Sequence, residues 1–275
     1  MTVPPTPPEP PDVVRLRSAF LVKHFTRHVH RFMAKRFSAV RLAREGARPA
    51  IGDGPLVVVL NHPSWWDPMM CVVLAARFPT RTAYAPIDAE ALRAYGFFRK
   101  LGFFGVEQGT LAGARAFLRT GTTLLARPHV AIWITPQGEF RDVRDRPPRL
   151  APGVGHLARH LRGGAVLPLA VEYPFWDESK PEALAAFGEP IAVEDGHART
   201  PAAWTARFED ALAATQDALA ARARARDPEA FEALIGGSAG VGGVYDAWRR
   251  FRAWLRGERF DPTHAAAMKK LGGGE

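Results

Sequence analysis

Cysteine is almost absent from the sequence: the 275 residues include a single one, Cys71, so no disulfide can form within the chain. A chain without disulfides is typical of a reducing compartment. The first residues, MTVPPTPPEPPDVV, also lack the basic stretch and the apolar core of a secretory signal. Together these absences favour a cytoplasmic protein.

Long apolar runs are missing as well. A transmembrane helix requires about 18 apolar residues without a charge, and no such run occurs, so we expect no membrane-spanning helix. The nine histidines show no H-E-x-x-H spacing. His24, His28 and His30 stand among arginines and lysines, which would repel a bound cation. We therefore expect no metal site and no resident cofactor.

Acidic residues are in the minority: 37 lysines and arginines face 28 aspartates and glutamates, which leaves a formal charge of +9. Such a surplus favours an anionic partner, either nucleic acid or the anionic face of a membrane. A bias in genomic base composition explains the many arginines equally well. The sequence contains no recognised nucleic-acid-binding module, so we expect no nucleic acid among the partners and an anionic membrane surface instead.

Apolar runs suited to strands alternate with segments of helical periodicity. This order predicts an α/β fold with a mainly parallel central sheet flanked by helices. Pro168 interrupts one apolar run, which suggests an edge strand or a bulge. Strands are expected at residues 39–42, 55–60, 82–85, 103–106, 130–134 and 165–172, and helices at 13–37, 69–78, 89–100, 113–126, 153–161 and 201–226.

The chain divides into four parts by composition. A proline-rich, disordered lead (1–12) precedes one large domain (13–235) that includes the N-terminal helix. A glycine-rich linker, GGSAGVGG (236–243), then leads to a basic-aromatic tail (244–275) with a predicted helix. The N-terminal and tail helices are both basic and amphipathic, so each either lies at a membrane interface or packs onto the domain.

His62 and Asp67 follow directly after the apolar run at 55–60, where ligand sites form in open α/β sheets. A carboxylate close to a histidine fixes the imidazole tautomer and makes it an oriented general base. The chain has no G-x-S-x-G elbow, so the base would activate a hydroxyl of the substrate itself. The alternative is a surface loop in which both residues are incidental.

Four blocks together resemble the lysophospholipid acyltransferase superfamily, whose members acylate lysophosphatidic acid or glycerol 3-phosphate. NHPSWWDP at 61–68 looks like its first block, a histidine and an aspartate separated by four residues. FGVEQ at 104–108, ITPQGEFR at 134–141 and VLPLA at 166–170 are similar to the second, third and fourth blocks, in the same order. The resemblance covers roughly residues 37–190.

The resemblance implies a glycerolipid acyltransferase-like fold and transfer of a fatty acyl group to a lipid hydroxyl. His62 would be the general base, oriented by Asp67, and acyl-CoA or acyl carrier protein would be the donor. It also implies a role in lipid metabolism, such as phospholipid biosynthesis, by a peripheral protein on the inner face of the cell membrane. The substrate-binding candidates are twelve residues of the first three blocks: Asn61, Ser64, Trp65, Trp66, Gly105, Glu107, Gln108, Pro136, Gln137, Gly138, Glu139 and Arg141.

Two departures from the family pattern bear on the acceptor. The second block usually carries an arginine that meets the acceptor's phosphate, and here that position is Gln108, beside Glu107. The third block usually has glutamate before its glycine, where this chain has Gln137. Without an arginine clamp for phosphate, unless Arg141 or Arg115 replaces it, the acceptor is either a lysophospholipid or a neutral lipid or glycolipid alcohol. The remaining alternative is a non-catalytic lipid- or membrane-binding protein on the same fold.

Overall fold

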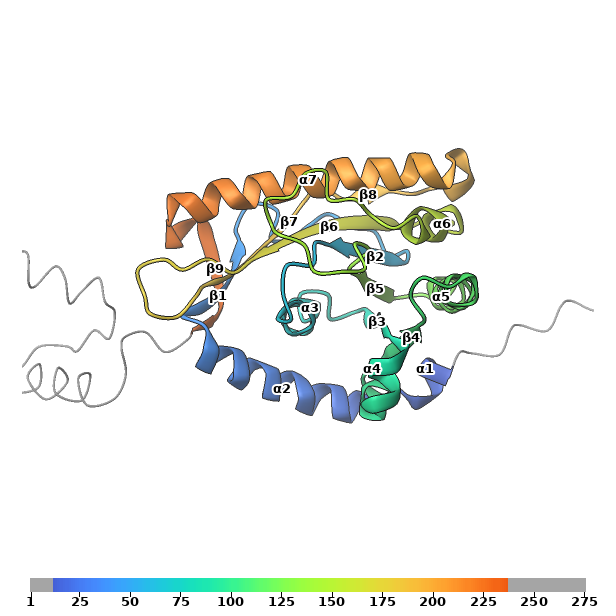
Figure 1. Ribbon diagram of the computed structural model, residues 1–275, viewed down its shortest axis with the longest axis horizontal. Helices are drawn as coiled ribbons and strands as arrows, with labels where there is room; N and C mark the ends of the chain where they lie inside the picture. Colours follow the sequence, from blue (N-terminus) through green and yellow to red (C-terminus); the bar gives the residue numbers. More distant parts are fainter. Residues whose placement is uncertain (1–11, 237–275) are drawn as a thin grey trace, which may run out of the picture.

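The computed structural model describes residues 12–236, which form a central sheet with helices on both faces (Figure 1). The strands are β1 (Ala39–Ala43), β2 (Leu56–Leu60), β3 (Thr82–Asp88), β4 (Phe103–Val106), β5 (Val130–Ile134), β6 (Ala165–Glu172), β7 (Ala183–Phe187), β8 (Ile191–Ala192) and β9 (Phe231–Gly236). The α-helices are α1 (Asp12–Leu16), α2 (Ala19–Arg36), α3 (Asp67–Ala75), α4 (Ala89–Ala94), α5 (Leu111–Leu125), α6 (Gly153–Arg159) and α7 (Pro201–Ala225), and the short 3₁₀ helices are η1 (Gly96–Leu101), η2 (Gly196–Ala198) and η3 (Pro228–Ala230).

Three of the parts expected from composition fall wholly or mostly outside these residues. They are the proline-rich lead, the glycine-rich linker beyond Gly236, and the basic-aromatic tail. Gly236 itself is the last residue of β9 and pairs with Ala39 of β1.

The sheet has the order β4-β3-β5-β2-β6-β7-β1-β9, and β8 adds to β6. Strands β4, β3, β5, β2 and β6 are parallel to their neighbours, as are β7 and β1, whereas β6–β7, β6–β8 and β1–β9 are antiparallel. This is the α/β architecture with a mainly parallel sheet that the alternating pattern predicts.

Central strands are covered on both faces, which explains their continuous apolar sequences. In β2, Leu56, Val58 and Leu60 pack toward α2 and α3, while Val57 and Val59 pack toward α5, α6 and α7. Figure 1 shows these two layers of helices on opposite sides of the sheet, with α7 running along one of them. The carboxyl ends of β2 and of its parallel neighbours, β5 and β6, therefore lie at the same edge of the sheet, between the two layers of helices.

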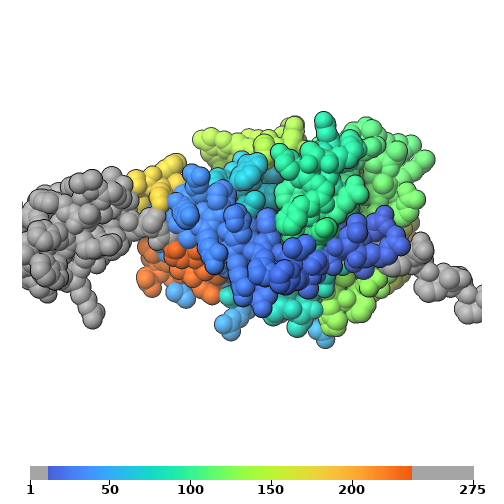
Figure 2. Space-filling model, turned by 90° about the horizontal axis from the view of Figure 1, so that it is seen from below, coloured from blue at the N-terminus to red at the C-terminus, as the bar shows by residue number. Residues whose placement is uncertain are grey.

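The N-terminal segment is two helices rather than the single helix expected at 13–37. The chain breaks at Arg17 and Ser18, and the Ser18 hydroxyl accepts a hydrogen bond from the Leu21 N–H to cap α2. Val29 and Met33 are fully buried in the core, so the apolar side of α2 packs onto the domain. The space-filling view shows α1 and α2 lying across this face of the molecule (Figure 2).

Pro168 is in an interior strand, so its interpretation as an edge residue is wrong. β6 lies between β2 and β7, and Pro168 is paired in register with Val59. On its other side, β8 pairs with residues 165–166 and β7 with residues 169–172, so Pro168 falls where one neighbour gives way to the next. The missing N–H of proline costs no ladder hydrogen bond at such a junction.

Strand β3 changes its partner half-way along. Thr82 to Tyr84 pair with β5, whereas the residues from Ala85 to Asp88 pair only with β4. Pro86 has no N–H to donate, which favours this departure from β5. The sheet therefore divides beside the carboxyl end of β5, next to the loop that carries His62.

Candidate active site

His62 and Asp67 form a hydrogen-bonded pair at the carboxyl end of β2. His62 lies just after that strand, and Asp67 begins α3. The His62 Nδ1 and Asp67 Oδ2 atoms are 2.6 Å apart. Since the Asp67 carboxylate accepts a hydrogen bond from Nδ1–H, the pair leaves His62 Nε2 unprotonated in the neutral imidazole and able to act as a base. The Asp67 side chain is fully buried, whereas that of His62 is 19% exposed.

Asp67 accepts two further hydrogen bonds. The Tyr173 hydroxyl donates to Oδ1 over 2.7 Å, and the Ser64 N–H donates to Oδ2 over 3.1 Å. Burial raises the pKa of the Asp67 carboxyl, and the hydrogen bonds from His62, Tyr173 and Ser64 oppose that rise. The same burial, with the negative charge of Asp67, raises the pKa of Tyr173 well above its ordinary value, so its hydroxyl stays protonated and donates.

The first and third sequence blocks are joined by two hydrogen bonds to the backbone of His62. The His62 N–H donates to Gln137 Oε1 over 2.6 Å, and the Arg141 N–H donates to the His62 carbonyl over 3.0 Å. Gln137 also donates from Nε2 to the Pro148 carbonyl over 2.8 Å. The buried Gln137 amide thus uses both of its ends to hold the His62 loop against the loop that follows β5.

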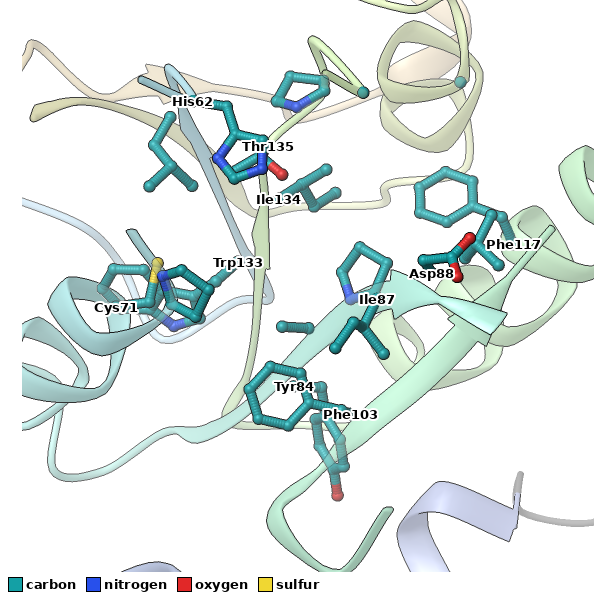
Figure 3. A pocket seen from close by; sticks show the side chains of 18 of the residues that line it. His62, Cys71, Tyr84, Ile87, Asp88, Phe103, Phe117, Trp133, Ile134 and Thr135 are labelled. Atoms are coloured by element: carbon teal, nitrogen blue, oxygen red, sulfur yellow. The ribbon is translucent and has the colours of Figure 1, made fainter. Parts of the chain in front are cut away.

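A cavity of about 830 Å³ lies against His62, where β3 departs from β5. His62 lies on one side of the cavity, and Tyr84 and Phe103 lie on the opposite side (Figure 3). Most of the wall is apolar and comes from α2, α3, β3 and β5. Its apolar side chains include Val22, Phe25, Cys71, Val72, Ala85, Ile87, Phe103, Phe117, Trp133 and Ile134.

Cys71 belongs to this apolar wall rather than to the chemistry. Burial, together with the nearby negative charge of Asp67, raises the pKa of its thiol far above the ordinary range. A thiol held protonated in this way is a poor nucleophile.

One part of the cavity wall is polar and acidic. Glu107, Gln108 and Glu139 line it, with Asp88. The side chains of Glu107 and Glu139 are 57% and 62% exposed, so this part opens to solvent. Glu107 is 4.0 Å from Arg93, and Glu139 forms an ion pair with Arg141, so the nearby arginines are engaged with carboxylates.

The predicted site residues divide into two groups. The cavity is lined by His62, Glu107, Gln108, Pro136, Gln137, Gly138 and Glu139. The others lie outside its lining: Asp67, Asn61, Ser64, Trp65, Trp66, Gly105 and Arg141.

Residues outside the lining have other visible contacts. Asn61 bridges β2 and β6, donating to the Val171 carbonyl and accepting from the Val171 N–H. Trp66 packs its ring against Phe32 and Phe37, whereas Trp65 is 59% exposed. Gly105 lies close to α4, because a Cβ there would be 3.3 Å from Ala89 and Leu92. Gly138, which does line the cavity, donates its N–H to the Thr135 carbonyl in a turn.

Three residues near the site are not predicted by the sequence reasoning: Tyr173, Phe140 and Arg17. Tyr173 holds Asp67, the Phe140 ring is 4.6 Å from the His62 ring, and Arg17 lines the cavity. A signal existed for Tyr173, because it follows β6, the strand beside β2, and adjacent parallel strands end at the same edge. Arg17 carries no such signal, because its position in the cavity wall depends on the break between α1 and α2, which the sequence pattern does not predict.

Between residues 12 and 236, no group of three or more His, Cys, Asp or Glu side chains is arranged to hold a metal ion. Within the same range, no helix combines the length and apolar character needed to cross a membrane.

Comparisons with known proteins match the same part of the chain. Residues 41–172, which contain His62, Asp67 and Gln137, match the model of the family described as Acyltransferase. The structure is similar to the crystal structure of the 1-acyl-sn-glycerophosphate (LPA) acyltransferase PlsC from Thermotoga maritima, with a TM-score of 0.51 and 14% identity over 78% of this chain and 88% of that one. At this identity, the likeness concerns the fold. No curated protein matches the sequence.

Proposed function

We propose that the chain, whose residues 41–172 match the Acyltransferase family model and whose fold is similar to that of PlsC, transfers a fatty acyl group from a thioester to a lipid hydroxyl. The observation that carries this proposal is the juxtaposition of two features. His62, hydrogen-bonded to the buried Asp67, lies at one side of a large cavity whose wall is mostly apolar. The base serves the hydroxyl, and the cavity suits a hydrocarbon chain.

In the proposed reaction, His62 Nε2 takes the proton of the acceptor hydroxyl as its oxygen bonds to the thioester carbonyl carbon. The carbon–sulfur bond then breaks, and the leaving thiolate takes the proton back from the imidazolium. Asp67 stabilises the imidazolium formed between these steps, and Tyr173 and Ser64 hold Asp67 in place. General-base assistance of this kind contributes about 10²–10⁴-fold to the rate, with positioning adding to it.

The polar wall bears on the acceptor. The similar PlsC structure is that of an enzyme acting on 1-acyl-sn-glycerophosphate. In this chain, Glu107 and Glu139 line the solvent-open part of the cavity, and the arginines beside them are paired. A phosphate would be repelled there, so we propose a neutral lipid or glycolipid alcohol as the acceptor, with a lysophospholipid as the competing candidate.

The donor and the location follow from the same proposal. Acyl-CoA or acyl carrier protein provides the thioester. The exposed side of α2 carries Lys23, Arg27, Arg31 and Lys35, which would attract anionic lipids. We therefore place the protein in the cytoplasm, peripherally on the inner face of the cell membrane.

The test offers the purified protein one acyl-CoA together with a panel of acceptors, and identifies the acylated product by mass spectrometry. The panel contains lysophosphatidic acid, glycerol 3-phosphate, neutral lipid alcohols and a glycolipid. We expect an ester product with a neutral acceptor to form fastest. If lysophosphatidic acid is acylated at least as fast, the neutral acceptor is wrong. If no acceptor is acylated, acyl transfer itself is wrong.

A further inference from the structure

Arg17 lines the cavity on the side away from His62. It lies between α1 and α2, and its Cδ and Nε atoms pack against Gly102, at the start of β4. Its guanidinium carbon is 5.8 Å from the centre of the Tyr84 ring. By strand register, Tyr84 is level with Val57, five residues before His62, which is about 16 Å at roughly 3.3 Å per residue.

The Arg17 guanidinium has no anionic partner within residues 12–236. Its Nε atom is buried and makes no hydrogen bond. Desolvation lowers the pKa of Arg17, and no carboxylate acts on the group to raise it. A partly buried cation without a partner is unfavourable, because it loses its hydration without gaining an ion pair.

Tyr84 is the polar side chain beside this cation. The positive charges of Arg17 and Arg127 both lower the pKa of the Tyr84 hydroxyl, although burial raises it overall. Arg127 itself is exposed and does not line the cavity. The Arg17 guanidinium thus lies beside the Tyr84 side chain, and a guanidinium with a hydroxyl is a donor set that matches an oxyanion.

We infer that Arg17, with Tyr84, forms an oxyanion subsite at the end of the cavity remote from His62. The cavity between the two ends is mostly apolar, so the oxyanion that fits is a carboxylate at the far end of an acyl chain. The inference rests on the proposed function only in placing the thioester end of that chain at His62. A free phosphate shares the same chemistry, and the experiment distinguishes the two sources.

The test measures binding by calorimetry with the full chain and without an acceptor, so that no transfer is needed. One ligand series is saturated acyl-CoA from octanoyl to hexadecanoyl, and the other has the same lengths with a terminal carboxylate. At one matched length, we expect the terminal carboxylate to bind roughly tenfold tighter. Arg17→Met keeps the apolar stem and is expected to abolish this preference, while Arg17→Lys retains part of it.

Inorganic phosphate is titrated separately into the wild type and into Arg17→Met. If phosphate binds the wild type alone, and the terminal carboxylate brings no gain, the subsite stands and its ligand is a free oxyanion. If neither ligand distinguishes the wild type from Arg17→Met, the subsite is wrong. Arg119→Met, an exposed arginine on α5 outside the cavity lining, is the matched control, and Tyr84→Phe reports independently if Arg17→Met fails to fold. If the wild type prefers the terminal carboxylate but transfers no acyl group to any acceptor, the proposed function is wrong and the subsite stands.

Discussion

At the residue scale, the burial of Asp67 and its proposed role have opposite effects on its charge. Complete burial makes its negative charge costly, yet the charge is what orients His62 and stabilises the imidazolium. Three donors meet this demand, and Tyr173 is the one that comes from a distant part of the chain. Sequence spacing predicts the partnership of His62 and Asp67, but it cannot predict a donor brought in by the packing of β6 beside β2.

Replacing Tyr173 by Phe removes one donor from Asp67 and should raise the pKa of that carboxyl further. The groups that act on Asp67 besides Tyr173 are His62, Ser64 and Cys71, and none of them replaces the lost hydrogen bond. Since Asp67 must be ionised, kcat of the variant should fall at a higher pH on the acidic side than kcat of the wild type, with KM unchanged.

The measurement is a profile of kcat against pH, with Tyr95→Phe as the control. Tyr95 is 65% exposed and lies outside the cavity lining, so its hydroxyl should not matter. An acidic limb at the same pH in the wild type and in Tyr173→Phe would show that the hydroxyl does not support Asp67.

Gln137→Glu should cost about 1–3 kcal/mol of stability at neutral pH, as is usual for a buried polar group left without its partner. The new carboxyl keeps an acceptor for the His62 N–H but turns an oxygen toward the Pro148 carbonyl, where the amide donates now. Burial raises the pKa of such a carboxyl, so the loss should be small below that pKa and should grow as the pH rises through it.

Urea unfolding at acidic and neutral pH measures this difference, and Gln108→Glu, at an exposed position, is the control. A Gln137→Glu variant as stable as the wild type at neutral pH would mean that the amide does not hold the two loops together.

At the element scale, the positions of strands and helices were predictable wherever burial produces a regular pattern of apolar residues in the sequence. Strands β2, β5 and β6 appear as continuous apolar runs, because both of their faces are covered. Strands β7 and β9, with the sequences ALAAF and FEALIG, are not predicted. Their small or charged residues give no strand pattern, and their conformation depends on pairing with β6 and β1, which are distant in sequence.

Helix α5 positions the second sequence block through a single glycine. A Cβ at Gly113 would lie 1.9 Å from the Glu107 carbonyl oxygen, so Gly113→Ala must displace the backbone of the residues that line the cavity. We expect a loss of about 1–3 kcal/mol in the free energy of unfolding, together with a raised KM for the acceptor.

Gly96→Ala is the matched control, because a Cβ there would meet nothing within 4 Å. Thermal unfolding and acceptor kinetics are measured for both variants. If both variants have the same stability and the same KM for the acceptor, Gly113 does not position the residues that line the cavity.

The whole molecule presents different surfaces on its two helical layers. The apolar side of α2 is buried against the domain, which leaves its exposed side with positive charges and the 68% exposed Phe20. Attraction to a membrane at this face would therefore be mainly electrostatic. The basic amphipathic pattern in the sequence predicts the helix and its charge, but only the tertiary structure shows which side is covered.

Charge reversal of Arg27 and Arg31 to Glu should weaken sedimentation with anionic vesicles by roughly tenfold or more, at about 1 kcal/mol per basic residue lost. The same reversal of Arg207 and Arg224, exposed on α7 in the opposite layer, changes the net charge equally and is the control. Equal weakening by the two pairs would mean that net charge, rather than the α2 face, determines membrane binding.

The central claim is that His62 removes the proton from the acceptor, and replacement of His62 by Ala tests it most directly. The measurement is the rate of acyl-ester formation by the wild type and by His62→Ala, alongside the affinity of each for the acyl thioester. The account predicts a fall of about 10²–10⁴-fold in the rate, with thioester affinity and thermal stability little changed. Acyl transfer at the wild-type rate by His62→Ala would contradict it, and the absence of transfer by either protein, with thioester affinity intact, would identify a lipid-binding protein instead.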